Sequence, residues 1–208
     1  MLDRFLALLA ALRAETPADA HFLFDDREPA GALRLANLRR YLDLVAGAPV
    51  LLVAEAPGYR GMTVTGVPFT SVRELAARPG PLTGRPEGDG FAVPESAYGW
   101  ELSASVVQRA LSRWPGARPA CWSIYPNHPF TAGAPPTNRA PRADEVRAGA
   151  PIALELIRAL GVQRVVAVGR KAQGALALAG VEAAAVRHPA QGGAGVFARQ
   201  MADLAASS

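Results

Sequence analysis

The sequence predicts an α/β fold, a three-layer α/β/α sandwich with a central four-stranded, mostly parallel sheet. Short apolar segments at 50–53, 120–125, 164–168 and 183–187 are typical of buried strands. Segments with helical spacing of apolar residues separate them, and this alternation indicates parallel strands joined by helical crossovers. With 208 residues and 50% hydrophobic composition the chain can bury one full core, so we expect a single domain over residues 1–208.

Two helices are expected ahead of the first strand, packed on the domain as residues 1–46. Apolar residues recur at helical spacing in the first helix: Leu2, Phe5, Leu6, Leu9 and Leu12. Acidic and basic residues at both of its ends favour an amphipathic helix over a signal peptide. The second helix begins at Pro29 and ends before Gly47. Residues 21–26, between the two helices, are expected to form a loop with buried aromatic side chains.

Three further features are expected between the first and second strands. Residues 71–78 predict a short helix in which Ser71 and Glu74 form a capping box. Residues 79–94, half of them proline or glycine, predict a long loop, which is either an insertion at the rim of the site or a surface segment without a role. Residues 101–113 predict a helix with one apolar face.

The rest of the chain alternates helices with the last two strands. Residues 142–160 predict a helical region that Pro151 kinks or breaks into two pieces. A helix over 170–179 is expected after the third strand, and a closing helix over 196–204 after the last one. The sequence contains no internal repeat.

Composition limits the partners and cofactors of the chain. With 22 Lys+Arg against 18 Asp+Glu the net charge is +4, which suits a polyanionic partner without requiring one. Cys121 is the single cysteine, so a disulfide framework and a thiolate cluster for zinc or iron–sulfur are excluded. No apolar run approaches the ~18 residues of a membrane span. We therefore expect a cytoplasmic monomer with no metal, no cofactor and no membrane contact.

Residues 50–70 form the most informative stretch. The apolar strand at 50–53 is followed by the carboxylate Glu55 and by a Pro57-Gly58 turn. Open parallel sheets bind ligands at the carboxyl ends of their strands, so Glu55 is expected at the edge of a site. Glycines in the turn allow the backbone to approach a ligand closely, and Phe69 can offer a flat apolar face.

Two motifs resemble those of the uracil-DNA glycosylase superfamily. The first consists of residues 55–58, Glu-Ala-Pro-Gly, with residues 65–69, Thr-Gly-Val-Pro-Phe; the second is the His188-Pro189 pair after the last strand. The resemblance covers about residues 47–204. It implies a uracil-DNA glycosylase-like fold, DNA containing uracil or another damaged base as partner, and cofactor-free removal of that base in base excision repair. Some relatives hold an iron–sulfur cluster on four cysteines, which this chain lacks.

The resemblance implies roles for individual residues. His188 would donate a hydrogen bond to the base oxygen as the N-glycosidic bond breaks, and Phe69 would stack on the flipped base. Glu55 would orient water or stabilise the sugar cation. Ala56 and Gly58 would line the base pocket. Gly58 stands where the best-known branch has a tyrosine that excludes the methyl group of thymine, so weaker discrimination against 5-substituted bases is expected.

Ser123 departs from the family pattern. Many relatives have an asparagine at the end of the second strand that reads the imide edge of the base, and Ser123 stands at that position here. A serine hydroxyl is shorter and cannot present a carbonyl and an NH₂ group together. Asn127 either substitutes for the missing amide or has a structural role in its turn. His128, in the same turn, has either a site role or a structural one.

DNA contacts are expected around the site. Ser103 and Ser105, near the start of a helix, provide either phosphate contacts or helix caps. Arg139 and Arg187 provide either phosphate contacts or solvated surface charge. One turn would approach the DNA backbone or enter the gap left by the flipped base: Gln191, Gly192 and Gly193.

These observations favour a monofunctional DNA glycosylase acting on uracil. Ser123 motivates a second hypothesis, a lesion-binding protein of the same fold with little or no turnover. A third keeps the glycosylase but changes the base to hypoxanthine, xanthine or a mismatched pyrimidine. Dinucleotide binding, P-loop nucleotide binding and serine hydrolysis are disfavoured because the chain lacks a GxGxxG after its first strand, a GxxxxGK[ST] and a GxSxG motif.

Overall fold

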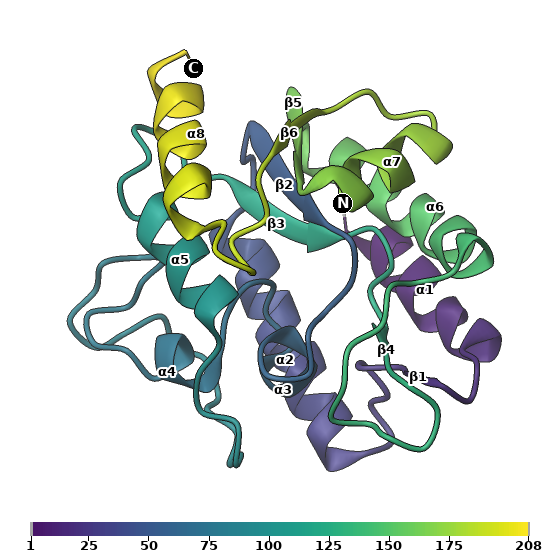
Figure 1. The fold of residues 1–208 in the computed structure, drawn as a ribbon. Coiled ribbons are helices and arrows are strands. Elements are labelled where there is room, and N and C mark those ends of the chain that lie inside the picture. Colours follow the sequence, from purple (N-terminus) through teal and green to yellow (C-terminus); the bar gives the residue numbers. More distant parts are fainter. Residues whose placement is uncertain (1, 208) are drawn as a thin grey trace.

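A parallel four-stranded sheet is the centre of the fold. The computed structural model describes residues 2–207, and within them the sheet strands are β2 (Val50–Ala54), β3 (Ala120–Ser123), β5 (Arg164–Val168) and β6 (Ala184–Val186). They lie in the order β3-β2-β5-β6, and every neighbouring pair is parallel (Figure 1). The predicted sheet is confirmed, with parallel pairing throughout.

The direction in which strands are added reverses beside β2. The chain passes from β2 outward to β3, then crosses to the other side of β2 and continues with β5 and β6. Leu52 of β2 therefore pairs with Cys121 on one side and with Val166 on the other. Open α/β sheets bind ligands at such a reversal, outside the carboxyl ends of the strands. The topology thus directs attention to the ends of β2 and β5.

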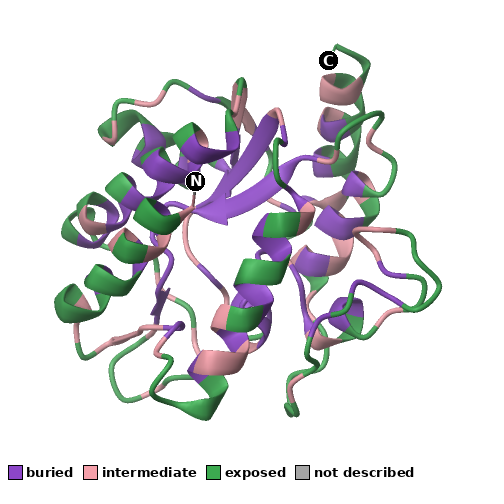
Figure 2. Cartoon of the chain, turned by 180° about the vertical axis from the view of Figure 1, so that it is seen from behind, coloured by how far each residue is buried: buried purple, intermediate pink, exposed green. Residues whose placement is uncertain are grey.

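Helices cover both faces of the sheet. One face is covered by α5 (Leu102–Leu111) and α8 (Ala194–Ala206), and the other by α1 (Asp3–Ala11), α6 (Ala143–Leu160) and α7 (Arg170–Leu178) (Figure 1). Alternate side chains of a strand point to opposite faces, so Leu52 packs in the core under α5 and α8, whereas Leu51 and Val53 pack in the other core. Burial on both faces explains the continuous apolar sequence of β2 (Figure 2).

The helix α2 (Pro29–Leu44) protects the edge of the sheet at β3. The Tyr41 hydroxyl accepts a hydrogen bond from the Cys121 N–H at 2.6 Å and donates one to the Cys121 carbonyl at 3.3 Å. β3 has a strand neighbour on only one side, so these backbone groups would otherwise be unpaired. Because Tyr41 and Cys121 are both buried, the hydroxyl replaces the missing strand at this position.

Some elements differ from their predictions. α6 runs unbroken through Pro151, so the predicted break into two pieces is wrong. The proline lies on the exposed face of the helix, and buried residues on both sides of it hold the helix against the core. The end of the predicted first helix is a separate 3₁₀ turn, η1 (Leu12–Glu15). Short elements also occur where loops or nothing regular was expected: β1 (Ala20–His21) paired with β4 (His128–Pro129), and α3 (Met62–Thr65).

The segment 71–94 is ordered by its own polar contacts. The predicted capping box of Ser71 and Glu74 is confirmed at the start of α4 (Val72–Leu75). In the loop that follows, the buried Asp89 carboxylate accepts hydrogen bonds from the backbone N–H groups of residues 82 and 83. The Asn37 side chain of α2 bonds both backbone groups of Ala92, at 2.8 and 2.9 Å. The loop therefore packs against α2.

Within residues 2–207, no helix has both the length and the apolar composition needed to cross a membrane.

Replacing Tyr41 by phenylalanine tests the protection of the sheet edge. The substitution keeps the ring but leaves the buried Cys121 N–H and carbonyl without a partner, so we expect the free energy of unfolding to fall by about 1–3 kcal/mol. Chemical denaturation measures this change. Tyr98→Phe, at an exposed tyrosine, serves as the matched control and should change stability by less than about 0.5 kcal/mol. Equal stability of the two variants would contradict the role of the hydroxyl.

Candidate functional site

A cavity of about 900 Å³ opens at the carboxyl edge of the sheet. Its walls include the last residues of the four strands, Ala54, Ser123, Val168 and Val186, together with residues from the first turns of α5, α7 and α8. The cavity therefore lies where the order of strand addition reverses, as expected for an open parallel sheet.

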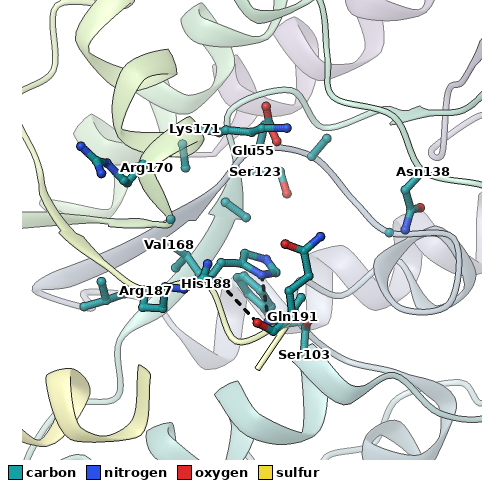
Figure 3. A pocket seen from close by; sticks show the side chains of 18 of the residues that line it. Glu55, Ser103, Ser123, Asn138, Val168, Arg170, Lys171, Arg187, His188 and Gln191 are labelled. Carbon is teal, nitrogen blue, oxygen red and sulfur yellow. Dashed lines mark hydrogen bonds between the residues drawn. The ribbon is translucent and has the colours of Figure 1, made fainter. Parts of the chain in front are cut away.

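Most residues that the sequence analysis selected line this cavity (Figure 3). They are Glu55, Ala56, Gly58, Phe69, Ser103, Ser123, Arg139, Arg187, His188 and Gln191. The two motifs, far apart in the chain, are thus brought to one cavity. The roles given to these residues remain predictions.

The starts of three helices give the cavity a positive electrostatic character. α5, α7 and α8 all begin there, and the first turn of a helix has N–H groups without intrahelical partners and the positive end of the helix dipole. Arg170, Lys171 and Arg187 add cationic side chains to the lining. Anionic groups such as phosphates are favoured at such a rim.

Glu55 is a half-buried carboxyl directly after β2. Its backbone carbonyl accepts a hydrogen bond from the Tyr125 N–H at 3.2 Å, which continues the contact between the two chain segments beyond the paired strands. Burial raises the pKa of the Glu55 carboxyl above its ordinary value of 4.5, and the charge of Lys171, seen beside it in Figure 3, partly offsets this. A carboxylate with a raised pKa is a stronger proton acceptor once ionised.

His188 keeps one ring nitrogen available for a ligand. The Ala190 N–H donates a hydrogen bond to Nδ1 at 3.1 Å, which assigns Nδ1 as the acceptor and the ring hydrogen to Nε2. Burial, and next the charge of Arg187, lower the pKa of His188 below its ordinary 6.5. At pH 7 the ring is therefore a neutral imidazole, and no hydrogen bond within residues 2–207 occupies its Nε2–H.

A tight turn fixes the backbone of His188. Gln191 and Gly192 have positive φ angles of 52° and 75°, and the Gly193 N–H donates to the Ala190 carbonyl at 3.1 Å. A Cβ atom on Gly193 would lie 2.0 Å from the His188 carbonyl oxygen, so a larger residue would displace the turn. Gln191 lines the cavity, whereas Gly192 and Gly193 do not; the two glycines shape the turn instead.

Phe69 is held at the cavity in an unusual conformation. Its φ angle is 47°, in the left-handed region that a bulky residue rarely adopts. Its carbonyl accepts a hydrogen bond from the Gln108 side chain at 3.1 Å, and the Thr65 hydroxyl donates to the Thr70 carbonyl at 2.7 Å. Strain of this kind persists where surrounding contacts enforce it, and it is common at ligand sites.

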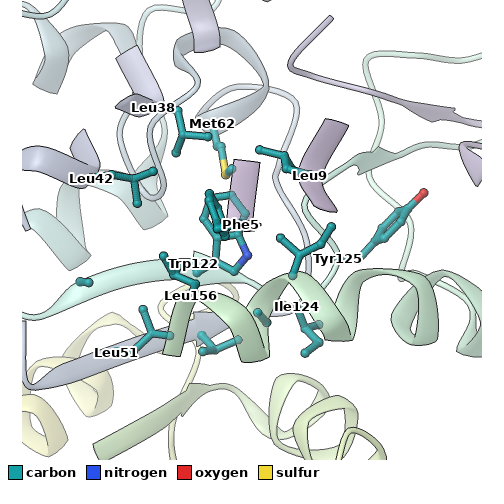
Figure 4. Close-up of a cluster of buried hydrophobic side chains, with 14 of the residues drawn as sticks. Phe5, Leu9, Leu38, Leu42, Leu51, Met62, Trp122, Ile124, Tyr125 and Leu156 are labelled. Carbon is teal, nitrogen blue, oxygen red and sulfur yellow. The ribbon is translucent and has the colours of Figure 1, made fainter. Parts of the chain in front are cut away.

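Ser123 ends β3 opposite Ala54 and is 4% exposed. The preceding Trp122 is fully buried and packs edge-on against Phe5, with ring centroids 5.1 Å apart (Figure 4). This packing anchors the end of β3, so Ser123 brings one hydroxyl to a fixed position in the cavity wall.

Glu101 also lines the cavity, although the sequence analysis gave it no role. It is the N-cap residue of α5, but its side chain makes no capping bond. A Cβ atom on Gly58 would lie 2.7 Å from Oε1, and one on Gly61 would lie 2.2 Å from Oε2. The carboxyl therefore fills the space beside Gly58. Burial, and next the charge of Glu74, raise its pKa to about 7.

A second polar group of the cavity and an aromatic cluster are joined to the segment that follows Gly58. Asn138 lines the cavity, and its Oδ1 accepts a hydrogen bond from the Tyr59 N–H at 3.0 Å. The rings of Tyr59 and Tyr98 meet edge to face with centroids 5.2 Å apart, and the Arg60 guanidinium lies 5.0 Å from the Tyr59 centroid. No sequence motif marks these contacts, because they join loops from separate parts of the chain.

Two predicted contacts are not brought to the cavity. Asn127 is fully buried, and its Nδ2 donates to the Thr16 hydroxyl at 2.9 Å and to the Tyr125 hydroxyl at 3.3 Å, so it does not substitute for an amide at Ser123. Ser105 donates to Glu74 at 2.5 Å and accepts from the Trp100 indole at 2.7 Å, which leaves its hydroxyl engaged. Residues 79–94 do not line the cavity either, so the loop is not an insertion at its rim.

Arg139 lines the cavity, but its guanidinium is committed to the fold. Its nitrogens donate to both carboxylate oxygens of Glu145, at 2.6 and 2.7 Å, to Asp19 at 3.0 Å and to the backbone carbonyls of Phe130 and Ala140. These contacts occupy all of its N–H groups, so the predicted phosphate contact is not available.

His128 is structural. Its two ring nitrogens face the carbonyl oxygens of Pro57, at 3.0 Å, and Pro135, at 3.2 Å. The ring is 2% exposed, and it ties the segment after β2 to the loop after β4.

Residues 2–207 contain no group of three or more His, Cys, Asp or Glu side chains arranged to hold a metal ion.

Replacing Arg139 by alanine tests its structural role. The substitution removes both hydrogen bonds that Arg139 donates to the buried Glu145 and leaves it only the longer contact with the Arg142 side chain and the Arg142 backbone N–H, so we expect the melting temperature to fall by roughly 5–10 °C. Arg109→Ala, at an exposed arginine on α5, is the matched control and should melt close to the unmodified protein. If Arg139→Ala kept its melting temperature and instead lost affinity for DNA, the phosphate contact would be restored as its role.

Comparison with known proteins concerns the fold. No family model matches the chain, and no curated protein sequence matches it. The structure is similar to the crystal structure of wild-type SMUG2 from Pedobacter heparinus, with a TM-score of 0.64 and 14% sequence identity, over 98% of this chain and 96% of that chain. At this identity the likeness establishes the fold alone. The predicted fold class is confirmed: the chain is an α/β/α sandwich with a four-stranded parallel sheet and shares its fold with that structure.

Proposed function

We propose that the chain is a monofunctional DNA glycosylase that hydrolyses the N-glycosidic bond of uracil, or of a related deaminated base, flipped out of DNA. One observation carries the proposal: Glu55, Phe69 and His188, from the two motifs that resemble those of the superfamily, line the same cavity at the carboxyl edge of the sheet. The similarity in fold to SMUG2 supports it.

The rim of the cavity suits a DNA strand. The helix N-termini and the side chains of Arg170, Lys171 and Arg187 favour phosphates, and Ser103 and Gln191 offer neutral hydrogen-bonding groups. A target base can reach the cavity only after it is unstacked from the duplex. Phe69 then stacks on its face.

His188 and Glu55 carry the chemistry in this proposal. As the bond between C1′ and the base nitrogen breaks, its electron pair passes to the base, and the Nε2–H of His188 donates a hydrogen bond to the base oxygen that becomes negative. Glu55 orients a water molecule and takes its proton as the water oxygen bonds to C1′. The proton taken up by Glu55 then passes through solvent to the departing base anion, so the products are an abasic site and the free base, Glu55 is ionised again and no cofactor is consumed.

Ser123 supports a second candidate function, binding of damaged DNA with little turnover. Its single hydroxyl cannot pair with both groups of an imide edge, and Asn127 is too far inside the protein to help. Slow or absent turnover would follow if no other group held the base.

Release of free uracil tests the proposal. An oligonucleotide with one deoxyuridine, single-stranded or opposite G or A, is expected to lose its base, and His188→Ala and Glu55→Ala are each expected to slow the single-turnover rate by roughly 10²–10⁴-fold. Glu182→Ala, at an exposed glutamate, is the control and should retain the full rate.

Full rates in both site variants would contradict the roles of these residues. Tight retention of the deoxyuridine strand without release by the unmodified protein would favour the lesion-binding candidate, and a panel of strands with hypoxanthine, xanthine or mismatched pyrimidines would then identify any other base.

The turn after His188 can be tested with two neighbouring glycines. In Gly193→Ala the new methyl group would collide with the His188 carbonyl, so the ring shifts and uracil release should slow by roughly tenfold or more. Gly195→Ala adds the same methyl group where no atom lies within 4 Å, and its rate should be unchanged. Equal rates, with melting temperatures showing that both variants fold, would refute the positioning role of the turn.

A further inference from the structure

Glu101 is a second carboxyl in the cavity that the proposed chemistry does not use. Its side chain makes no capping bond to α5 and lies against Gly58 and Gly61, where an added Cβ atom would come within 2.7 and 2.2 Å of its oxygens and would push the carboxyl out of its place. Its oxygens have no hydrogen-bond partner within residues 2–207. The two glycines therefore make room for a carboxyl whose hydrogen-bonding groups are available to a ligand.

The protonation state of Glu101 decides what it can bind. A neutral carboxylic acid presents one O–H donor and one carbonyl acceptor, whereas a carboxylate presents acceptors alone. The edge of uracil, and likewise that of hypoxanthine, has an N–H beside a C=O. A neutral acid matches such an edge with two hydrogen bonds, as a carboxamide does, but a carboxylate faces the C=O with a repulsive lone pair.

We infer that Glu101, as a neutral carboxylic acid, reads the N–H/C=O edge of the flipped base and supplies the pair of hydrogen-bonding groups that Ser123 cannot. This inference rests on the proposed function and extends it to a substrate class, bases with a lactam or imide edge. It also assigns a use to Gly58, which gives space to Glu101 instead of leaving the pocket open.

The surroundings of Glu101 keep it neutral up to about neutral pH. Burial raises its pKa to about 7, the carboxylate of Glu74 on α4 acts in the same direction, and Arg60 in the loop after β2 acts against both. Arg139, in the loop that carries Asn138, is held by Glu145 and Asp19. Base recognition should therefore weaken as pH rises through about 7, when Glu101 ionises.

Glu101→Gln and Glu101→Ala test the inference over a range of pH. Glutamine keeps one donor and one acceptor at every pH, so Glu101→Gln should release uracil within about threefold of the unmodified rate at pH 6 and show no loss between pH 6 and 8, where the unmodified protein loses activity. Glu101→Ala should lose roughly tenfold or more at pH 6. Two results would overturn the inference: a loss of activity above about pH 7 that persists in Glu101→Gln, or an unchanged rate in Glu101→Ala.

Binding separates this inference from the proposed function. Two variants are compared, His188→Ala and His188→Ala/Glu101→Gln. For each, fluorescence anisotropy at pH 6 and 8 measures the affinity for the deoxyuridine oligonucleotide and for the same strand carrying an abasic analogue. The inference is supported, even if no base is released, when His188→Ala prefers the deoxyuridine strand at pH 6 but not at pH 8 and His188→Ala/Glu101→Gln prefers it at both pH values. The same preference at both pH values in both proteins overturns it, even if uracil release establishes the glycosylase.

Discussion

Parallel pairing of β2 with both β3 and β5 is the constraint on which the rest of the structure depends. Parallel strands end at one edge, so Glu55, Ser123 and the segment of His188 reach the same side of the sheet. The helices that follow β5 and β6 start at that edge, which brings their positive ends to the cavity. The reversal of strand order beside β2 leaves space between the outgoing chains, and the cavity occupies it.

The site is organised by backbone contacts outside it. A hydrogen bond from the Ala190 N–H orients the His188 ring, and the turn that supplies it closes only because Gly193 has no side chain. The Gln108 side chain and the Thr65 hydroxyl hold the segment that carries Phe69 in its left-handed conformation. Groups that are held before a ligand arrives need little reorganisation when it binds, which is the arrangement that electrostatic stabilisation of a transition state requires.

The features that could be predicted are those set by residues close together in the chain. The apolar runs and the groups that follow them identified the strands and brought Glu55, Ser123 and His188 to one cavity. Arg139 and Ser105 were assigned to DNA because the sequence does not show which groups they contact: Arg139 pairs with Glu145, six residues on, and with Asp19, 120 residues away, and Ser105 pairs with Glu74. Glu101 was missed because its place in the cavity is set by contact with Gly58 and Gly61, which are distant in the chain. The continuity of α6 through Pro151 was missed because it depends on tertiary packing of the helix.

Mass spectrometry of an intact single-deoxyuridine oligonucleotide after incubation with the protein tests the central claim most directly. Free uracil is expected together with an uncut strand that has lost the base and gained a hydroxyl at C1′, since hydrolysis breaks the glycosidic bond and leaves the phosphodiesters in place. An unchanged strand after prolonged incubation, or a strand cleaved at the sugar without an abasic intermediate, would contradict hydrolysis by water at the Glu55 and His188 site.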